Sequence, residues 1–93
     1  MAAYSRETYT APQCSATIGR FTAEYSRWRV VVEAWPADER FEGRLVFQQE
    51  PLRGAPDSRA SAPMLSGRTP EEVVSAAHEL PEKQVRALLH SLF

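Results

Sequence analysis

The pattern of apolar and polar positions predicts strands in the first half of the chain and helices in its last third. Apolar and polar side chains alternate in residues 20–25 and again in 41–49, the period of two that is typical of a strand with one buried face. Residues 28–35 contain three consecutive valines, which pack better on a sheet than in a helix. We therefore predict three antiparallel strands, joined by a turn at residues 26–27 and by a charged turn at 36–40 whose proline ends the second strand.

The pattern of residues in the C-terminal third of the chain predicts two helical segments. Thr69-Pro70-Glu71-Glu72 forms a capping box, in which the threonine caps the helix, Glu72 reaches back and Pro70 occupies the first helical position. Pro81 then interrupts the pattern because it lacks a backbone N–H. The segments are either two helices or one helix kinked at Pro81. Their apolar stripes comprise Val73, Ala76, Ala77 and Leu80, and then Val85, Leu88, Leu89, Leu92 and Phe93.

Strands followed by helices indicate an α+β fold, an antiparallel sheet of three to four strands with two C-terminal helices packed on one face. Residues 1–16 show no periodicity, and we expect a loosely ordered tail there. Residues 17–93 are expected to form a single domain with a mobile, proline-rich loop at 50–63. The short stretch 64–66 is expected to return as a brief edge strand.

Composition narrows the class of protein. The net charge of −1, from 11 basic and 12 acidic residues, lacks the excess of one sign that broad affinity for nucleic acid or anionic membranes requires. Nothing in the chain resembles an apolar membrane span of ~18 residues or a secretory signal. Cys14 is the single cysteine, which excludes an internal disulfide and suits a cytoplasmic protein.

The candidate reactive side chains do not form a catalytic or metal-binding pattern. Cys14 lies in the predicted tail, without a cation or helix terminus to lower its pKa, and His78 and His90 are expected on helix surfaces. His78 and Glu82 are four residues apart, but Pro81 disturbs the helix between them. The four glycines are scattered rather than gathered in a phosphate loop. We therefore predict no catalytic, cofactor-binding or metal-binding residues and no enzymatic activity.

The strand alternation predicts a second sheet face away from the helices. Trp28 and Trp35 fall on opposite faces of one strand, so both are buried only if each face is covered. An open second face would carry a candidate interaction surface, which comprises Arg29, Val31, Trp35, Arg44 and Val46. Alternatively, the N-terminal tail, with Tyr4 and Tyr9, folds over it.

The arginines of this face also suggest nucleic-acid binding as a second hypothesis. Arg20, Arg29 and Arg44 would form a basic stripe beside a stacking platform at Trp35. Comparable positions on the same strands hold Glu24, Glu33 and Glu42, which favours cross-strand Arg–Glu pairs instead. The helix–proline–helix end offers few basic residues to a DNA groove. We therefore rank nucleic acid below protein as the partner.

Residues 29–80 resemble the HicB-like antitoxin fold. The features that carry the resemblance are Val31-Val32-Glu33, the acidic turn Asp38-Glu39, Phe41-Glu42-Gly43, and the helix start Gly67-Arg68-Thr69-Pro70-Glu71-Glu72. The proline-rich segment 50–63 and the additional N-terminal hairpin depart from the family pattern. The resemblance implies a non-catalytic domain that binds and masks a small RNA-cleaving toxin, often as an oligomer.

Together these observations predict a cytoplasmic, non-catalytic protein-interaction module. We expect it to associate with itself, as a homodimer, or to act as the antitoxin-like partner of a small protein. The alternative is a small nucleic-acid-binding module that uses the sheet arginines. No cofactor and no membrane contact are expected.

Overall fold

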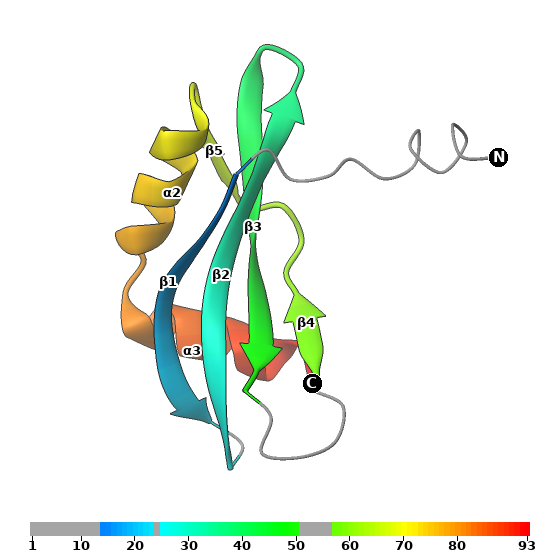
Figure 1. Ribbon diagram of the computed structural model, residues 1–93, viewed down its shortest axis with the longest axis vertical. Coiled ribbons are helices and arrows are strands. Elements are labelled where there is room, and N and C mark those ends of the chain that lie inside the picture. The colour runs from blue at the N-terminus through cyan, green and yellow to red at the C-terminus, as the bar shows by residue number, and fades with distance from the viewer. Residues whose placement is uncertain (1–13, 24, 51–56) are drawn as a thin grey trace, which may run out of the picture.

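The computed structural model describes residues 14–23, 25–50 and 57–93, which form one antiparallel sheet and two helices (Figure 1). The sheet order is β1-β2-β3-β4, and β5 pairs with β3 beyond the end of β4. The α+β class predicted from the sequence is confirmed, with one more short strand than expected. The strands are β1 (Cys14–Ala23), β2 (Ser26–Ala37), β3 (Arg40–Gln49), β4 (Ser58–Ala60) and β5 (Leu65–Gly67); the helices are α2 (Pro70–His78) and α3 (Glu82–Ser91).

The β2–β3 hairpin is the longest pairing in the sheet. Its register runs without a break from Trp28 opposite Gln49 to Ala37 opposite Arg40, and Asp38 takes the left-handed conformation (φ 55°) in the turn. The expectation that Pro36 ends the strand is wrong, because β2 continues through it. Pro36 lies next to the closing pair of the turn, a position where an antiparallel ladder needs no N–H bond to the opposite strand.

The turn between β1 and β2 lies two residues earlier than predicted. Ala23 pairs with Ser26, and Tyr25 adopts φ 62° with its side chain fully exposed. This register places Trp28 opposite Phe21, where the indole Nε1 donates to the carbonyl of Ala23 at 3.0 Å. The turn is therefore positioned by a buried tryptophan rather than by preferred turn residues.

Strand β1 is longer than the sequence analysis predicted. It begins at Cys14 rather than after residue 16, so residues 14–16 belong to the sheet and not to the tail. The register with β2 shifts between Thr17 and Gly19, which leaves Ile18 as the extra residue of a bulge. The bulge keeps the apolar positions on both sides of it on the helix-covered face, where they pack against the core.

The segment after β3 contributes two short strands along the same edge. β4 pairs with residues 46–48 and β5 pairs with residues 41–43 of β3. Between them the buried Ser61 accepts from Leu45 N at 3.1 Å and donates to the Ala62 carbonyl. The brief edge strand predicted near residues 64–66 is confirmed, whereas the loop predicted at 50–63 contains β4; residues 51–56 lie outside the described part of the chain.

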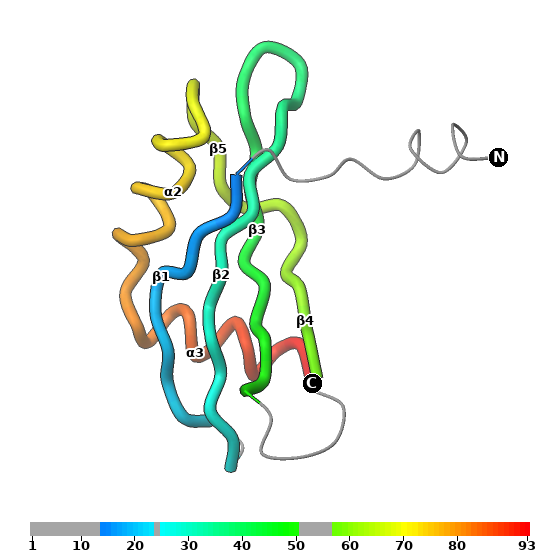
Figure 2. The backbone as a smooth tube through the Cα atoms, viewed as in Figure 1, coloured from blue at the N-terminus to red at the C-terminus, as the bar shows by residue number. Residues whose placement is uncertain are grey.

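Both helices cover one face of the sheet (Figure 2). The capping box is confirmed, since Thr69 Oγ1 accepts from Glu72 N and the Glu72 carboxylate accepts from Arg68 N. The helices are separate, because α2 ends at His78 and α3 starts after Pro81. The buried cluster between the layers contains Trp28, Val30, Val32, Ala34, Leu45, Phe47, Leu65, Val73, Ala77, Val85 and Leu89.

Two arginines attach the α3 region to the two edge strands of the sheet. Arg86 lies over the Phe21 ring and donates to the Thr22 carbonyl at 2.9 Å, which ties the middle of the helix to β1. Arg59 of β4 lies over the Phe93 ring, 4.3 Å from its centroid, and donates to the carbonyl of Leu92 just after the helix. α3 and the residues that follow it are therefore tied to both edges of the sheet, and both contacts are charge-assisted.

Helix α2 approaches the sheet closely at Gly43. Gly43, which has no side chain, pairs with Ala34, so two small residues lie next to each other under the helix. A Cβ at Gly43 would overlap Val73 Cγ1 and lie 2.9 Å from the backbone oxygen of Glu33. The distance between the layers therefore depends on the absence of a side chain at residue 43.

We expect Gly43→Ala to lower the free energy of unfolding by about 1–3 kcal/mol, because the added methyl overpacks the contact with α2. Gly19→Ala is the matched control, since a Cβ there meets no atom within 4 Å. Urea denaturation of both variants measures the difference. Equal midpoints for the two variants would contradict the close-packing account.

Candidate functional site

The candidate site is the sheet face turned away from the helices, called here the outer face. Alternation along the strands places Arg29, Val31 and Trp35 of β2 on it, beside Arg44 and Val46 of β3. The five residues predicted to form an interaction surface therefore lie on one face of two neighbouring strands. No described helix or strand packs on this face.

The centre of the outer face is apolar but not open. Val31 and Val46 are direct cross-strand partners, and only 7% and 5% of their surfaces are exposed. The two valines therefore do not contribute to the open apolar patch that an uncovered face would carry. The longer polar side chains at the neighbouring positions of both strands flank the pair, and such side chains cover apolar surface with their stems. Trp35 is half-buried, so it presents the larger apolar side chain at this face.

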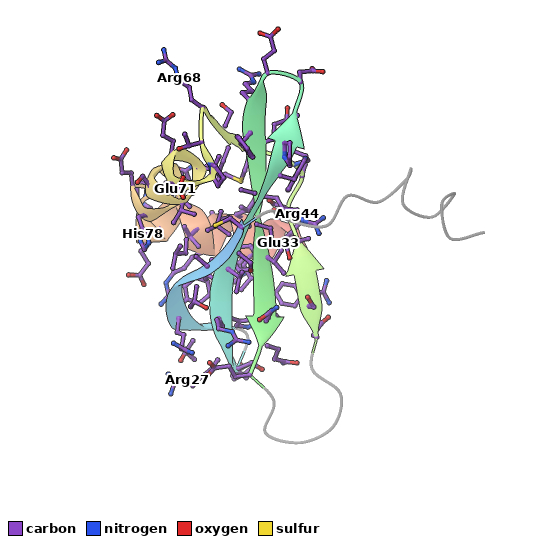
Figure 3. All side chains as sticks on the ribbon, turned by 45° about the horizontal axis from the view of Figure 1, so that its top comes forward. Arg27, Glu33, Arg44, Arg68, Glu71 and His78 are labelled. Carbon is purple, nitrogen blue, oxygen red and sulfur yellow. The ribbon has the colours of Figure 1, made fainter. Side chains whose placement is uncertain are left out.

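The predicted cross-strand Arg–Glu pairing occurs at Glu33 and Arg44. Arg44 Nη2 lies 3.0 Å from Glu33 Oε1, and its Nε donates to the same oxygen at 3.1 Å. The Arg44 guanidinium also lies 6.0 Å from the centroid of the Trp35 ring. Figure 3 shows this pair near the middle of the sheet. The charge of Arg44 is therefore matched by a neighbour and oriented beside Trp35.

Arg29 is held by a neutral partner rather than by a carboxylate. Its Nε and Nη2 donate to Gln48 Oε1 at 3.1 and 2.8 Å. Arg20 of β1 lies directly opposite Arg29 in the register. Like charges in directly opposite positions destabilise a sheet. This end of the outer face therefore keeps two adjacent guanidinium groups at some cost in stability.

Glu50 is the carboxylate that partly compensates this basic end. It accepts from Arg20 Nε at 2.6 Å and lies 3.5 Å from Arg27 Nε. The hydrogen bond from Arg20 lowers the pKa of the Glu50 carboxyl below its ordinary value, and the nearby charges of Arg27 and Arg29 act in the same direction. Glu24, predicted to pair with these arginines, lies outside the described residues.

The opposite end of the outer face is acidic. Glu42 lies opposite Trp35, and Asp38 and Glu39 form the exposed turn between β2 and β3. Within residues 14–23, 25–50 and 57–93, these three carboxylates have no ion-pair partner. The outer face therefore has one basic and one acidic end.

A separate cavity of about 190 Å³ lies between the β1 bulge and the connection of the two helices. His78 and Glu82, which the sequence analysis considered as a pair, both line it. Arg20 is the third charged or titratable residue in the wall, and the rest of it comprises Ile18, Gly19, Phe21, Val30, Ala77, Leu80 and Val85. Most of the wall therefore offers packing surface rather than groups that could do acid–base chemistry.

The other candidate reactive residues are dispersed. Cys14 packs against the core from β1, whereas His78 and His90 are exposed on α2 and α3. The described part of the chain contains no cluster of three or more potential metal ligands. Nor does any helix in that part have the length and apolar character needed to cross a bilayer.

No protein-family model, curated protein or solved structure matches this chain. The functional argument therefore depends on the geometry of the outer face.

Sequence reasoning missed Glu50 as a member of the outer face. Strand alternation does place Gln48 beside Arg44 and Val46, but Gln48 was not counted in the candidate interaction surface. Glu50 joins the face through a backbone bond from its N–H to the Arg27 carbonyl at 2.8 Å, at the end of the β3 ladder. No local pattern predicts that contact.

An NMR titration of Glu50 should give a pKa below the ordinary 4.5, and Arg20→Gln should raise it toward that value. Because the folded-state pKa is lowered, the Arg20–Glu50 pair stabilises the fold above the ordinary pKa. This stabilisation is lost as the pH falls through the lowered value. Arg68→Gln is the control, since its side chain is exposed at the far end of the molecule (Figure 3). An unchanged Glu50 pKa in Arg20→Gln would contradict the assigned hydrogen bond.

Proposed function

We propose that this chain is a non-catalytic protein-interaction module that binds through the outer face of its sheet. The ligand is either a second copy of the chain or a small partner protein, as for an antitoxin-like domain. The observation that carries the proposal is a sheet face that no described element covers and that presents Trp35 among several arginines.

The composition of the outer face supports a protein interface. Non-obligate interfaces are about as apolar as other protein surfaces, and tryptophan and arginine are enriched in them. Trp35 is already flanked by Arg44, whose guanidinium is held by Glu33. This arrangement lowers the entropy cost of ordering these side chains when a partner binds.

The positions of the antitoxin-like sequence features are consistent with the antitoxin version of the proposal but do not distinguish it from other partners. Val31-Val32-Glu33 lies in β2, Phe41-Glu42-Gly43 begins β3, and the capping box begins α2. Gly67 ends β5, and a Cβ there would lie 2.7 Å from the Cβ of Glu72. These residues thus have structural roles that any protein with this arrangement would need. They support a shared architecture more strongly than a shared partner.

A nucleic-acid-binding module is the second candidate, and the opposed pair Arg20 and Arg29 favours it. Glu50 neutralises part of that charge, and Arg44 is paired with Glu33. A fluorescence titration against mixed oligonucleotides, repeated at increasing salt, separates the two functions. Binding at low salt that falls steeply with added salt would favour nucleic acid; no binding at low salt excludes it.

Trp35→Ser should weaken the affinity for the protein ligand about tenfold or more, because a tryptophan in an interface is commonly a hot spot. The ligand is first identified by affinity purification from nuclease-treated lysate of the native host, with self-association measured in parallel. Tyr25→Ser is the control, since Tyr25 is a fully exposed aromatic residue in the β1–β2 turn. Equal affinities of Trp35→Ser and the unmodified chain would show that the outer face is not the interface.

A further inference from the structure

The outer face is polarised along the direction of its strands. Among the described residues of β1, β2 and β3, its basic end carries three arginines, Arg20, Arg27 and Arg29, and one carboxylate, that of Glu50. Among the described residues of β2, β3 and the turn between them, its acidic end carries the carboxylates of Glu42, Asp38 and Glu39 and one basic residue, Arg40. The formal charges of the two described ends are therefore equal and opposite. Figure 3 shows Arg27 at one end of the sheet, away from the central Glu33–Arg44 pair.

Contacts within the described part of the chain do not neutralise the charge at either end. Arg29 is bound to the neutral Gln48, and Arg20 and Arg27 share one carboxylate. Glu42 has no ion-pair partner among the described residues. From Arg29 to Trp35 the strand rises about 20 Å, so the two ends lie too far apart to pair in one copy.

We propose that the outer faces of two copies pack against each other with their strands antiparallel, around a two-fold axis across the β2–β3 hairpin. This inference rests on the proposed function and identifies the partner as a second copy of the chain. A two-fold operation that reverses the strand direction brings the basic end of each copy onto the acidic end of the other. The contact is then self-complementary, as a closed symmetric dimer requires.

The register determines which residues meet if the axis passes between the Val31–Val46 and Glu33–Arg44 pairs. Arg29 of each copy then faces the position of Trp35 and Glu42 in the other. A guanidinium group binds both an aromatic face and a carboxylate, so this position satisfies the Arg29 charge and covers Trp35. The opposite orientation, with parallel strands, would place the basic end of each copy over the basic end of the other and is disfavoured by repulsion.

The size of the outer face is sufficient for such a dimer. Three strands of ten to twelve residues, about 4.8 Å apart, and the short β4 and β5 along the β3 edge give a flat area of roughly 600 Å² per copy. A stable interface buries about 800 Å² per partner, and side chains that project from a sheet add to its flat area. Aligned packing of two sheets is a common arrangement of β-sheet layers.

Charge exchange between copies tests this dimer directly. Arg29→Glu and Glu42→Arg should each lower the association constant at least about tenfold in sedimentation equilibrium, because each places like charges opposite each other at two symmetric contacts. An equimolar mixture of the two variants should recover association, since both contacts in the mixed dimer pair opposite charges. Lys83→Glu makes the same change in net charge at an exposed position of α3, which covers the other face of the sheet, and should associate as the unmodified chain does.

Three outcomes would overturn the inference: a monomeric unmodified chain at millimolar concentration, a dimer unaffected by both substitutions, or a weakened dimer that mixing does not restore. Circular dichroism and thermal melting confirm that each variant is folded before it is measured. A monomeric chain whose binding to another protein still depends on Trp35 would refute the second copy as partner while leaving the proposed function intact. A chain that shows neither self-association nor Trp35-dependent binding to another protein would refute both the dimer and the proposed function.

Discussion

The pairing of β2 with β3 is the constraint on which the rest of the structure depends. Its unbroken register puts Trp28, Val30 and Val32 on the helix side, with the two valines opposite large apolar residues of β3, and puts the polar pairs on the outer side. A shift of one residue would exchange the two faces and expose the core. Helix α2 then packs over Ala34 and Gly43, where the small residues of the hairpin leave room for it. β1 is attached to this frame by a ladder of nearly the same length, whereas β4 and β5 each pair with three residues of β3.

Much of the fold could be predicted because its signals are local. The period of two in the central strands and the capping box at residues 69–72 each depend on neighbouring residues. The β1–β2 turn could not be placed, because its position follows from the contact of Trp28 with β1 across the sheet. β4 carries no β-branched or aromatic residue. It is a strand through its bonds to β3 and through the contact of Arg59 with the C-terminal residues, both of which are distant in sequence.

In the candidate site, too, local patterns predicted some features, whereas others depend on contacts that are distant in sequence. Alternation along the strands was enough to place the five predicted residues on one face. Opposite charges at comparable positions were enough to predict cross-strand Arg–Glu pairing, of which the structure forms the Glu33–Arg44 pair. The burial of Val31 and Val46 could not be read from alternation, because it depends on the flanking side chains of the neighbouring strand. The opposition of Arg20 and Arg29 likewise depends on the bulge in β1, which shifts the register after Thr17.

The central claim is that the outer face is a contact surface between copies, and a dilution series followed by two-dimensional NMR of the ¹⁵N-labelled chain tests it most directly. The account predicts concentration-dependent shifts for the Trp35 indole and for the backbone amides of Arg29 and Glu42, with α2 and α3 unaffected. Shifts confined to the helices, or spectra that do not change with concentration, would contradict it.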